Sequence, residues 1–357
     1  MHKLWIMLCL MLLPTLVSHA GYTLKNGKWV NSNYVATMSV QEHYAAAMDA
    51  YQKQEWEELV LQALIVTSNF SSTPFADESL FYLGVGYFHT SEFEQANSAL
   101  TQYLKKQATP KFFEEAIQYK FKIAEQFHGG AKRHILGWES MPKWLPARDE
   151  AIAIYDEVIT ALPHHELAAQ ALFGKGQLLL MDEDYKACVE TYQTLIRRFP
   201  KHPLSVESYI GICEAYLVQC KEEYPDQDFL DLAEINLKKF RNGFPGEERL
   251  ALAEGMVMEM KELFASNLYD TGRFYERTKK PHAAYIYYTR IMAKYPNTKT
   301  AQVASRRLTK MKYRPQEEKE ESSEVVSPLL KLPVTGQLVD SEPKMMDLPS
   351  SEEDVVR

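Results

Sequence analysis

The chain has 357 residues, of which 46% are apolar and 25% are charged. This balance is ordinary for a globular protein and leaves enough apolar residues for a sizeable core. The net charge of −8 argues against a nucleic acid as the partner, because surfaces that bind nucleic acids are usually basic.

The first twenty residues are typical of a secretory signal peptide. A short polar start precedes an apolar run at residues 4–17, and Ser18-His19-Ala20 is a small-x-small cleavage pattern. The apolar run is too short for a helix that spans a membrane. We therefore expect export and cleavage after Ala20.

Residues 21–38 are expected to form an extended lead-in or a small hairpin. Polar and apolar residues alternate on either side of Asn26-Gly27, which is a hairpin-type turn signal. Helical periodicity begins near Ser39, which can cap the first helix together with Glu42.

A fixed spacing recurs along residues 39–312. A small residue is followed twelve and sixteen positions later by two apolar residues, and prolines end these units at positions 110, 200 and 296. The three uninterrupted sets are Gly84 with Ala96 and Leu100, Gly176 with Cys188 and Tyr192, and Gly272 with Ala284 and Tyr288. Small residues let two helices approach closely, which is typical of the helix–turn–helix unit of a tetratricopeptide repeat.

Three further units fit this spacing less regularly, and they begin at Ala47, Ala124 and Cys213. The chain is therefore predicted to be an all-α solenoid of five to six tetratricopeptide-type repeats, because no repeat can bury its apolar face alone. Residues 247–263 are either an additional helix or a lengthening of the last unit.

Three cysteines follow the expected cleavage site, namely Cys188, Cys213 and Cys220. They are too few for a disulfide framework and contain no CxxC motif. The sequence favours buried packing residues, and one disulfide between Cys188 and Cys213 is the alternative.

The insertion at residues 128–147 is basic and rich in tryptophan in an otherwise acidic chain. Trp138, Lys143 and Trp144 have the composition of a protein interface, so we expect a partner-binding loop. The alternative is that the tryptophans fasten the loop to the solenoid.

A second candidate surface follows the first helices of the repeats. The positions three residues before each small residue should form an apolar row, and those one residue after it should form a polar row. An apolar row beside a polar row suits an extended peptide. The residues expected to bind peptide or partner there are Phe81, Phe121, Phe173, Gln177, Tyr269 and Arg273. The alternative is that the aromatic residues pack between repeats.

The sequence contains no motif of a phosphate loop, zinc helix, calcium loop or nucleophile elbow. His164-His165-Glu166 is the nearest approach to a metal cluster, and a capping role in the loop is favoured for it. We therefore expect no enzyme activity, no metal and no cofactor.

The composition changes after residue 312. Residues 314–357 contain eleven acidic and five basic residues, together with five prolines, and lack aromatic side chains. A disordered acidic tail at residues 313–357 is predicted.

Two stretches carry a family resemblance. The first is LYDTGRFYERTKKPHAAYIYYTRIMAKYPNTKTAQVASRRL at residues 268–308, and the second is TYQTLIRRFPKHPLSVESYIGICEAYL at residues 191–217. They resemble repeats of the BamD (YfiO) type of outer-membrane protein assembly factor. The resemblance implies a periplasmic scaffold at the inner face of the outer membrane. It would bind a BamA-type barrel insertase and unfolded barrel precursors.

One departure concerns the anchor. Members of that family usually carry a lipidated cysteine directly after the signal peptide, whereas Gly21 stands there in this chain. We therefore expect attachment to the membrane through partners. The alternative function is that of a periplasmic repeat protein that coordinates cell division with peptidoglycan synthesis, although no heptad run typical of those proteins is present.

Overall fold

The computed structural model describes residues 22–25, 28–31, 34–135, 141–223 and 226–311. The predicted signal peptide and acidic tail lie outside these residues.

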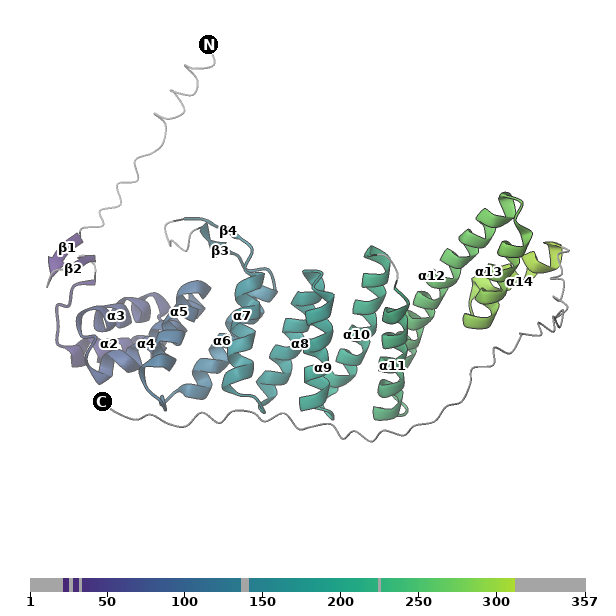
Figure 1. The fold of residues 1–357 in the computed structure, drawn as a ribbon. Coiled ribbons are helices and arrows are strands. Elements are labelled where there is room, and N and C mark those ends of the chain that lie inside the picture. The colour runs from purple at the N-terminus through teal and green to yellow at the C-terminus, as the bar shows by residue number, and fades with distance from the viewer. Residues whose placement is uncertain (1–21, 26–27, 32–33, 136–140, 224–225, 312–357) are drawn as a thin grey trace, which may run out of the picture. The chain divides into compact units, whose positions relative to one another are not determined.

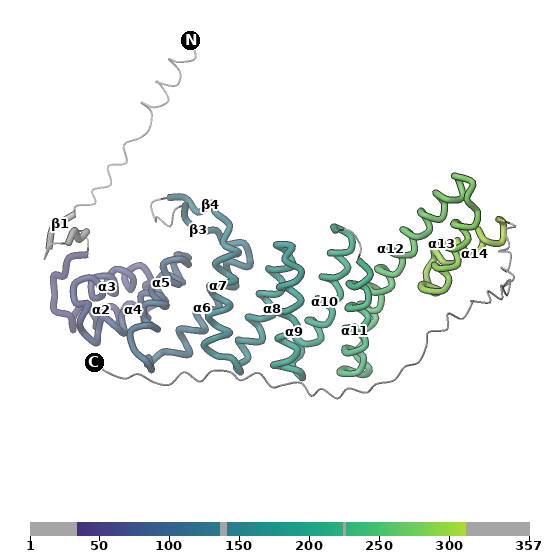
Figure 2. Tube along the Cα trace, in the orientation of Figure 1, coloured from purple at the N-terminus to yellow at the C-terminus, as the bar shows by residue number. Residues whose placement is uncertain are grey.

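The described residues contain thirteen helices, arranged as six consecutive pairs and one closing helix (Figures 1 and 2). The pairs are α2 (Val40–Lys53) with α3 (Trp56–Asn69), α4 (Pro74–His89) with α5 (Phe93–Lys106), α6 (Phe113–His128) with α7 (Arg148–Ala161), α8 (Glu166–Met181) with α9 (Tyr185–Arg198), α10 (Pro203–Glu222) with α11 (Gln227–Gly243), and α12 (Leu250–Arg277) with α13 (Pro281–Lys294). Helix α14 (Lys299–Met311) follows. Each helix packs against its neighbours in the chain, and the first helix of each pair also contacts the first helix of the next pair. This confirms the predicted all-α solenoid, with six repeats.

The repeat spacing corresponds to direct contact between the two helices of a pair. A Cβ atom added to Gly84 would lie 2.6 Å from Leu100 Cγ, and one added to Gly272 would lie 2.7 Å from Tyr288 Cε1. The ring of Tyr192 lies against both Gly176 and Gly211, which belong to successive repeats. A glycine at these positions therefore allows the helices to pack closely around a buried side chain.

A buried lysine joins the second and third repeats. Lys120 on α6 is fully buried, and its Nζ donates to Asn97 Oδ1 at 2.5 Å and to Thr101 Oγ1 at 2.6 Å on α5. The same atom lies 2.6 Å from a carboxylate oxygen of Glu157 on α7. Burial lowers the pKa of Lys120, and the hydrogen bond to Glu157 opposes that shift.

Helix α12 has 28 residues, so residues 250–263 lengthen the last repeat and do not form a separate helix. Ala253, Val257, Met260 and Phe264 are buried at helical spacing, on the part of α12 that packs against α10 and α11. The start of the first helix was also predicted correctly, because Ser39 and Glu42 form a capping box.

All three described cysteines are buried and free, which confirms the packing interpretation and excludes a Cys188–Cys213 disulfide in this structure. Burial raises the pKa of Cys188 to about 12, and the pKa values of Cys213 and Cys220 to about 11. Cys213 Sγ also accepts a hydrogen bond from Asn236 Nδ2 at 3.2 Å.

Four short strands form two antiparallel hairpins. Strands β1 (Tyr22–Lys25) and β2 (Lys28–Asn31) pair in the lead-in, and β3 (Arg133–His134) and β4 (Lys143–Leu145) pair in the insertion between α6 and α7.

The lead-in is attached to the first repeat by His43, a buried residue on α2. The backbone amides of Thr37 and Met38 donate to His43 Nε2, at 3.3 Å each. His43 Nδ1 lies 2.6 Å from Gln62 Oε1. Because Nε2 accepts these hydrogen bonds, the ring donates to Gln62 through Nδ1.

Candidate partner-binding surfaces

Two of the aromatic residues predicted to line a groove are instead part of the core. Phe81 is 4% exposed, and its ring stacks on Phe112 with centroids 4.6 Å apart. Phe121 is 7% exposed, with its ring 6.0 Å from that of Tyr155 on α7. The expectation that Phe81 and Phe121 lie open to a peptide is therefore corrected, because neighbouring helices cover both rings.

The other four predicted residues of this row reach the surface. Phe173 and Tyr269 are half-buried, while Gln177 and Arg273 are exposed. The ring of Phe173 lies 5.8 Å from that of Tyr192. Each aromatic ring thus has one side on the core and part of its edge at the surface of α8 or α12. A role for these four residues in binding stays a prediction.

The ring of Tyr269 rests on a fixed neighbour. It lies 5.4 Å from the ring of buried Tyr288, whose hydroxyl donates to Glu276 Oε2 at 3.0 Å. Arg307 Nε on α14 donates to the same carboxylate oxygen at 2.9 Å. This network connects α12, α13 and α14 directly beneath the predicted contact residue.

The insertion hairpin is fastened to the preceding repeat. His134 is 6% exposed, and its Nε2 lies 2.8 Å from Glu92 Oε2 in the turn between α4 and α5. Its backbone amide donates to Glu94 at 2.6 Å. Lys143 Nζ donates to the Ser91 carbonyl at 2.8 Å and to Glu92 Oε1 at 2.9 Å. The side chains of His134 and Lys143 therefore hold the hairpin on one carboxylate.

The hydrogen bond between His134 and Glu92 shifts the pKa values of both groups. The hydrogen bond to Glu92 raises the pKa of His134, and the bond to the Met141 carbonyl adds to the effect. Burial alone would raise the pKa of Glu92, but the bonds from His134 and Lys143 outweigh it and lower that pKa. The charged forms of both groups are thus favoured together.

The fastened hairpin presents apolar side chains to solvent. Trp144 is 68% exposed, and Met141 and Leu145 are each 37% exposed. Trp144 therefore does not fasten the loop to the solenoid, which contradicts the packing alternative for this residue. Lys143 also anchors the hairpin through Glu92, and its predicted role as a partner contact stays a prediction. Trp138 lies outside the described residues.

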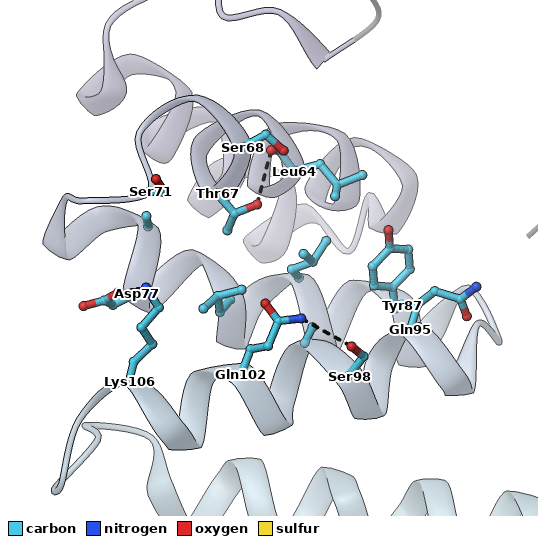
Figure 3. A pocket seen from close by; sticks show the side chains of 14 residues that line it. Leu64, Thr67, Ser68, Ser71, Asp77, Tyr87, Gln95, Ser98, Gln102 and Lys106 are labelled. Carbon is cyan, nitrogen blue, oxygen red and sulfur yellow. Dashed lines mark hydrogen bonds and ion pairs between the residues drawn. The ribbon is translucent and has the colours of Figure 1, made fainter. Parts of the chain in front are cut away.

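A further cavity of about 420 Å³ lies between α3, α4 and α5, and sequence reasoning did not find it (Figure 3). Leu80, Leu83 and Tyr87 of α4 are among the residues that line it. Its walls are polar and include Thr67 and Ser68 of α3, with Ser98 and Gln102 of α5, as Figure 3 shows. A similar cavity of about 650 Å³ lies between α5, α6 and α7. Such cavities depend on the spacing of helices from successive repeats, which no local sequence pattern indicates.

The histidine cluster serves helix capping, as predicted. His165 Nδ1 accepts a hydrogen bond from the backbone amide of Leu167 at 3.1 Å and so caps α8. Glu166 accepts from His202 Nε2 at 2.9 Å in the next repeat. Across the described part of the chain, no group of three or more metal-ligating side chains could hold an ion. None of the described helices has the length and apolarity needed to cross a membrane.

Several known proteins are similar to this chain. Among solved structures, a tetratricopeptide repeat protein from Parabacteroides merdae is 13% identical, covering 76% of this chain and 97% of its own, with a TM-score of 0.34. Part of a repeat protein from Cytophaga hutchinsonii is 12% identical over 74% of this chain and 87% of its own, with a TM-score of 0.34. MamA from Desulfovibrio magneticus is 12% identical, covering 58% of this chain and 97% of its own, with a TM-score of 0.33. No curated protein matches the chain significantly.

The family match is carried by the second half of the solenoid. Residues 150–326 match the model of the YfiO family, which is described as an outer membrane lipoprotein. Within the described residues, this match includes almost all of α7 and every helix from α8 to α14. In this chain of six stacked helix pairs, residues 150–326 are therefore tetratricopeptide-type repeats of the YfiO (BamD-like) type.

Proposed function

We propose that this protein is a non-enzymatic periplasmic scaffold of outer-membrane β-barrel assembly. It binds a BamA-type insertase, unfolded barrel precursors, or both, at the inner face of the outer membrane. The observation that carries this proposal is the match of residues 150–326 to the YfiO family. Export by the signal peptide predicted at residues 1–20 accounts for the compartment.

The insertion hairpin supports a role in binding a folded partner. Trp144 offers a large apolar side chain of the kind that dominates protein interfaces. Because His134 and Lys143 fix the hairpin on Glu92, little conformational freedom is lost when a partner covers it. We assign the insertase contact to this hairpin.

The surface of α8 and α12 supports a role in binding extended segments. Phe173 and Tyr269 offer partly exposed aromatic rings, and Gln177 and Arg273 offer exposed polar groups one turn further along the same helices. An unfolded barrel segment carries alternating apolar side chains and unpaired backbone groups, so it needs both kinds of contact. We assign the precursor contact to these four residues.

The insertase contact is tested by pull-down from envelope extracts with the full-length chain. The wild type should recover a BamA-type barrel protein, and Trp144→Ala should recover several-fold less. Leu252→Ala, at a 57% exposed position on α12, is the matched control and should behave as the wild type. Recovery of peptidoglycan synthases without a barrel protein would reject the proposed function.

The precursor contact needs a separate measurement. Phe173→Ala combined with Tyr269→Ala should weaken binding of barrel C-terminal peptides in fluorescence anisotropy while circular dichroism stays unchanged. Ile235→Ala, at a 51% exposed position on α11, controls for the loss of exposed apolar surface. Equal peptide affinity in the double variant and the wild type would remove these residues from the site.

A further inference from the structure

The last repeat carries a local excess of positive charge. Residues 270–311, from the end of α12 to the end of α14, contain ten lysine and arginine residues and two acidic residues, a net charge of +8. Residues 34–269 contain 21 basic and 35 acidic residues, a net charge of −14. One end of the solenoid is therefore strongly basic, whereas the rest is acidic.

The turn between α12 and α13, at the upper right of Figure 1, gathers three of these cations. Arg277, Lys279 and Lys280 are exposed, and none of them forms an ion pair with a carboxylate of the described residues. The nearest acidic residue in the sequence, Glu276, is already engaged, because Arg307 Nε donates to its carboxylate at 2.9 Å. The three charges can therefore attract an anionic group from outside.

Apolar side chains are exposed beside these cations. Phe274 is 52% exposed near the end of α12 and lies three residues before Arg277, so the two share one side of the helix. Ile286 is 50% exposed on α13. The ring of Phe274 lies 5.5 Å from that of Tyr275, which stacks on Tyr287 of α13 at 5.4 Å. Both helices thus offer apolar surface next to positive charge.

The backbone of the turn is closed by its own hydrogen bonds. The Thr278 amide donates to the Phe274 carbonyl at 3.0 Å. The Lys280 amide donates to the Tyr275 carbonyl at 2.9 Å. Lys279 has a φ of 59°, in the left-handed region that commonly ends a helix. Because these contacts fix the turn, little backbone freedom is lost when its side chains meet a surface.

We propose that this turn binds the surface of an anionic phospholipid bilayer. Arg277, Lys279 and Lys280 contact headgroup phosphates, and Phe274 and Ile286 enter the boundary between headgroups and acyl chains. A bilayer surface accepts both kinds of side chain at once. A purely acidic peptide would match the cations and leave the two apolar groups without a contact. The inference does not rest on the proposed function, because vesicle binding and recovery of an insertase are separate measurements.

The larger part of this contact is electrostatic. One lysine or arginine near an anionic membrane contributes about fivefold to the affinity, so three contribute about a hundredfold. The attraction extends about 8 Å from the surface at physiological salt, and added salt shortens this distance. The apolar contact of Phe274 and Ile286 is not screened in this way.

The test measures co-sedimentation of the processed chain, residues 21–357, with lipid vesicles. Without the predicted signal peptide, its apolar run cannot bind the lipid. One set of vesicles is phosphatidylcholine alone, and the other also contains phosphatidylglycerol. The test variant combines Arg277→Gln, Lys279→Gln and Lys280→Gln.

The matched control removes the same charge from exposed positions in or just after α9. It combines Lys186→Gln, Arg198→Gln and Lys201→Gln, and none of these three residues forms an ion pair with a described carboxylate. A single variant, Phe274→Ala, tests the apolar contact, with Leu252→Ala at a 57% exposed position as its control. Circular dichroism should be the same for all of these proteins.

The wild type and the charge control should bind the anionic vesicles, and the triple variant should bind them about a hundredfold more weakly. Neutral vesicles should bind little of any protein, and about 0.5 M salt should remove most of the wild-type binding. Phe274→Ala should bind several-fold more weakly than Leu252→Ala.

Equal binding of the wild type to both kinds of vesicle, or an equal loss in the triple variant and its control, would overturn the proposal. Equal binding of Phe274→Ala and Leu252→Ala would reject the apolar part of the contact. A hexaglutamate peptide that binds the wild type but not the triple variant, while anionic vesicles bind neither, would also overturn the proposal. The turn would then belong to an acidic protein segment.

Discussion

Gly272 determines how closely α12 approaches α13, so its replacement by alanine tests the repeat geometry. An added Cβ atom would lie 2.7 Å from Cε1 of Tyr288, which is fully buried and hydrogen-bonded to Glu276. Overpacking of this kind costs about 1–3 kcal/mol, while alanine is more favourable than glycine inside a helix by about 0.8–1 kcal/mol. We expect Gly272→Ala to lower the free energy of unfolding by about 0–2 kcal/mol on these two estimates.

Gly255 provides a matched control in the same helix. A Cβ atom added there would meet nothing within 4 Å, so Gly255→Ala should stabilise the protein by about 0.5–1 kcal/mol. Repeat proteins can open locally, so urea denaturation should be combined with hydrogen exchange of α13. If Gly272→Ala stabilises the protein as much as Gly255→Ala does, α12 and α13 do not pack as closely at Gly272 as the structure shows.

Two further predictions concern the insertion hairpin and the cysteines. Because its bond to Glu92 raises the pKa of His134, the stabilisation of the hairpin is complete below the ordinary histidine range and is lost as the pH rises through the raised value. The backbone amide of residue 134 should exchange faster as the pH rises through this value in the wild type, after correction for the intrinsic pH dependence of exchange. The same pH dependence in the His134→Gln variant would contradict the prediction. Burial raises the pKa of all three described thiols, so Cys188, Cys213 and Cys220 should resist a thiol reagent at pH 8 and all react in denaturant. Mass spectrometry that finds fewer than three modified thiols in the denatured, unreduced chain would indicate a disulfide.

The repeat architecture was predictable because its signals are local. The twelve- and sixteen-residue spacings describe two helices and one turn, so Gly84 with Leu100 and Gly272 with Tyr288 are pairs within one unit. The capping box is local as well, because it joins Ser39 to Glu42 only three residues later. Residues 270–311 contain ten basic and two acidic residues, a local charge that the net charge of −8 over the whole chain conceals.

The candidate site was only partly predictable because exposure depends on other repeats. Phe81 and Phe173 occupy equivalent positions in the repeat pattern, yet Phe112 covers the first, and the second reaches the surface. Likewise, the sequence gives no indication that Lys143 donates to Glu92, which lies 51 residues earlier.

The sequence by itself determined the helices, their pairing into repeats and the distribution of charge, since helical periodicity, capping and composition act over short stretches of chain. Only the tertiary structure decided which side chains are covered. It buried Lys120 among Asn97, Thr101 and Glu157, and it left Trp144 exposed on a fastened hairpin. The physical reason is that burial and ion pairing join residues from different repeats, whose approach depends on how the repeats stack.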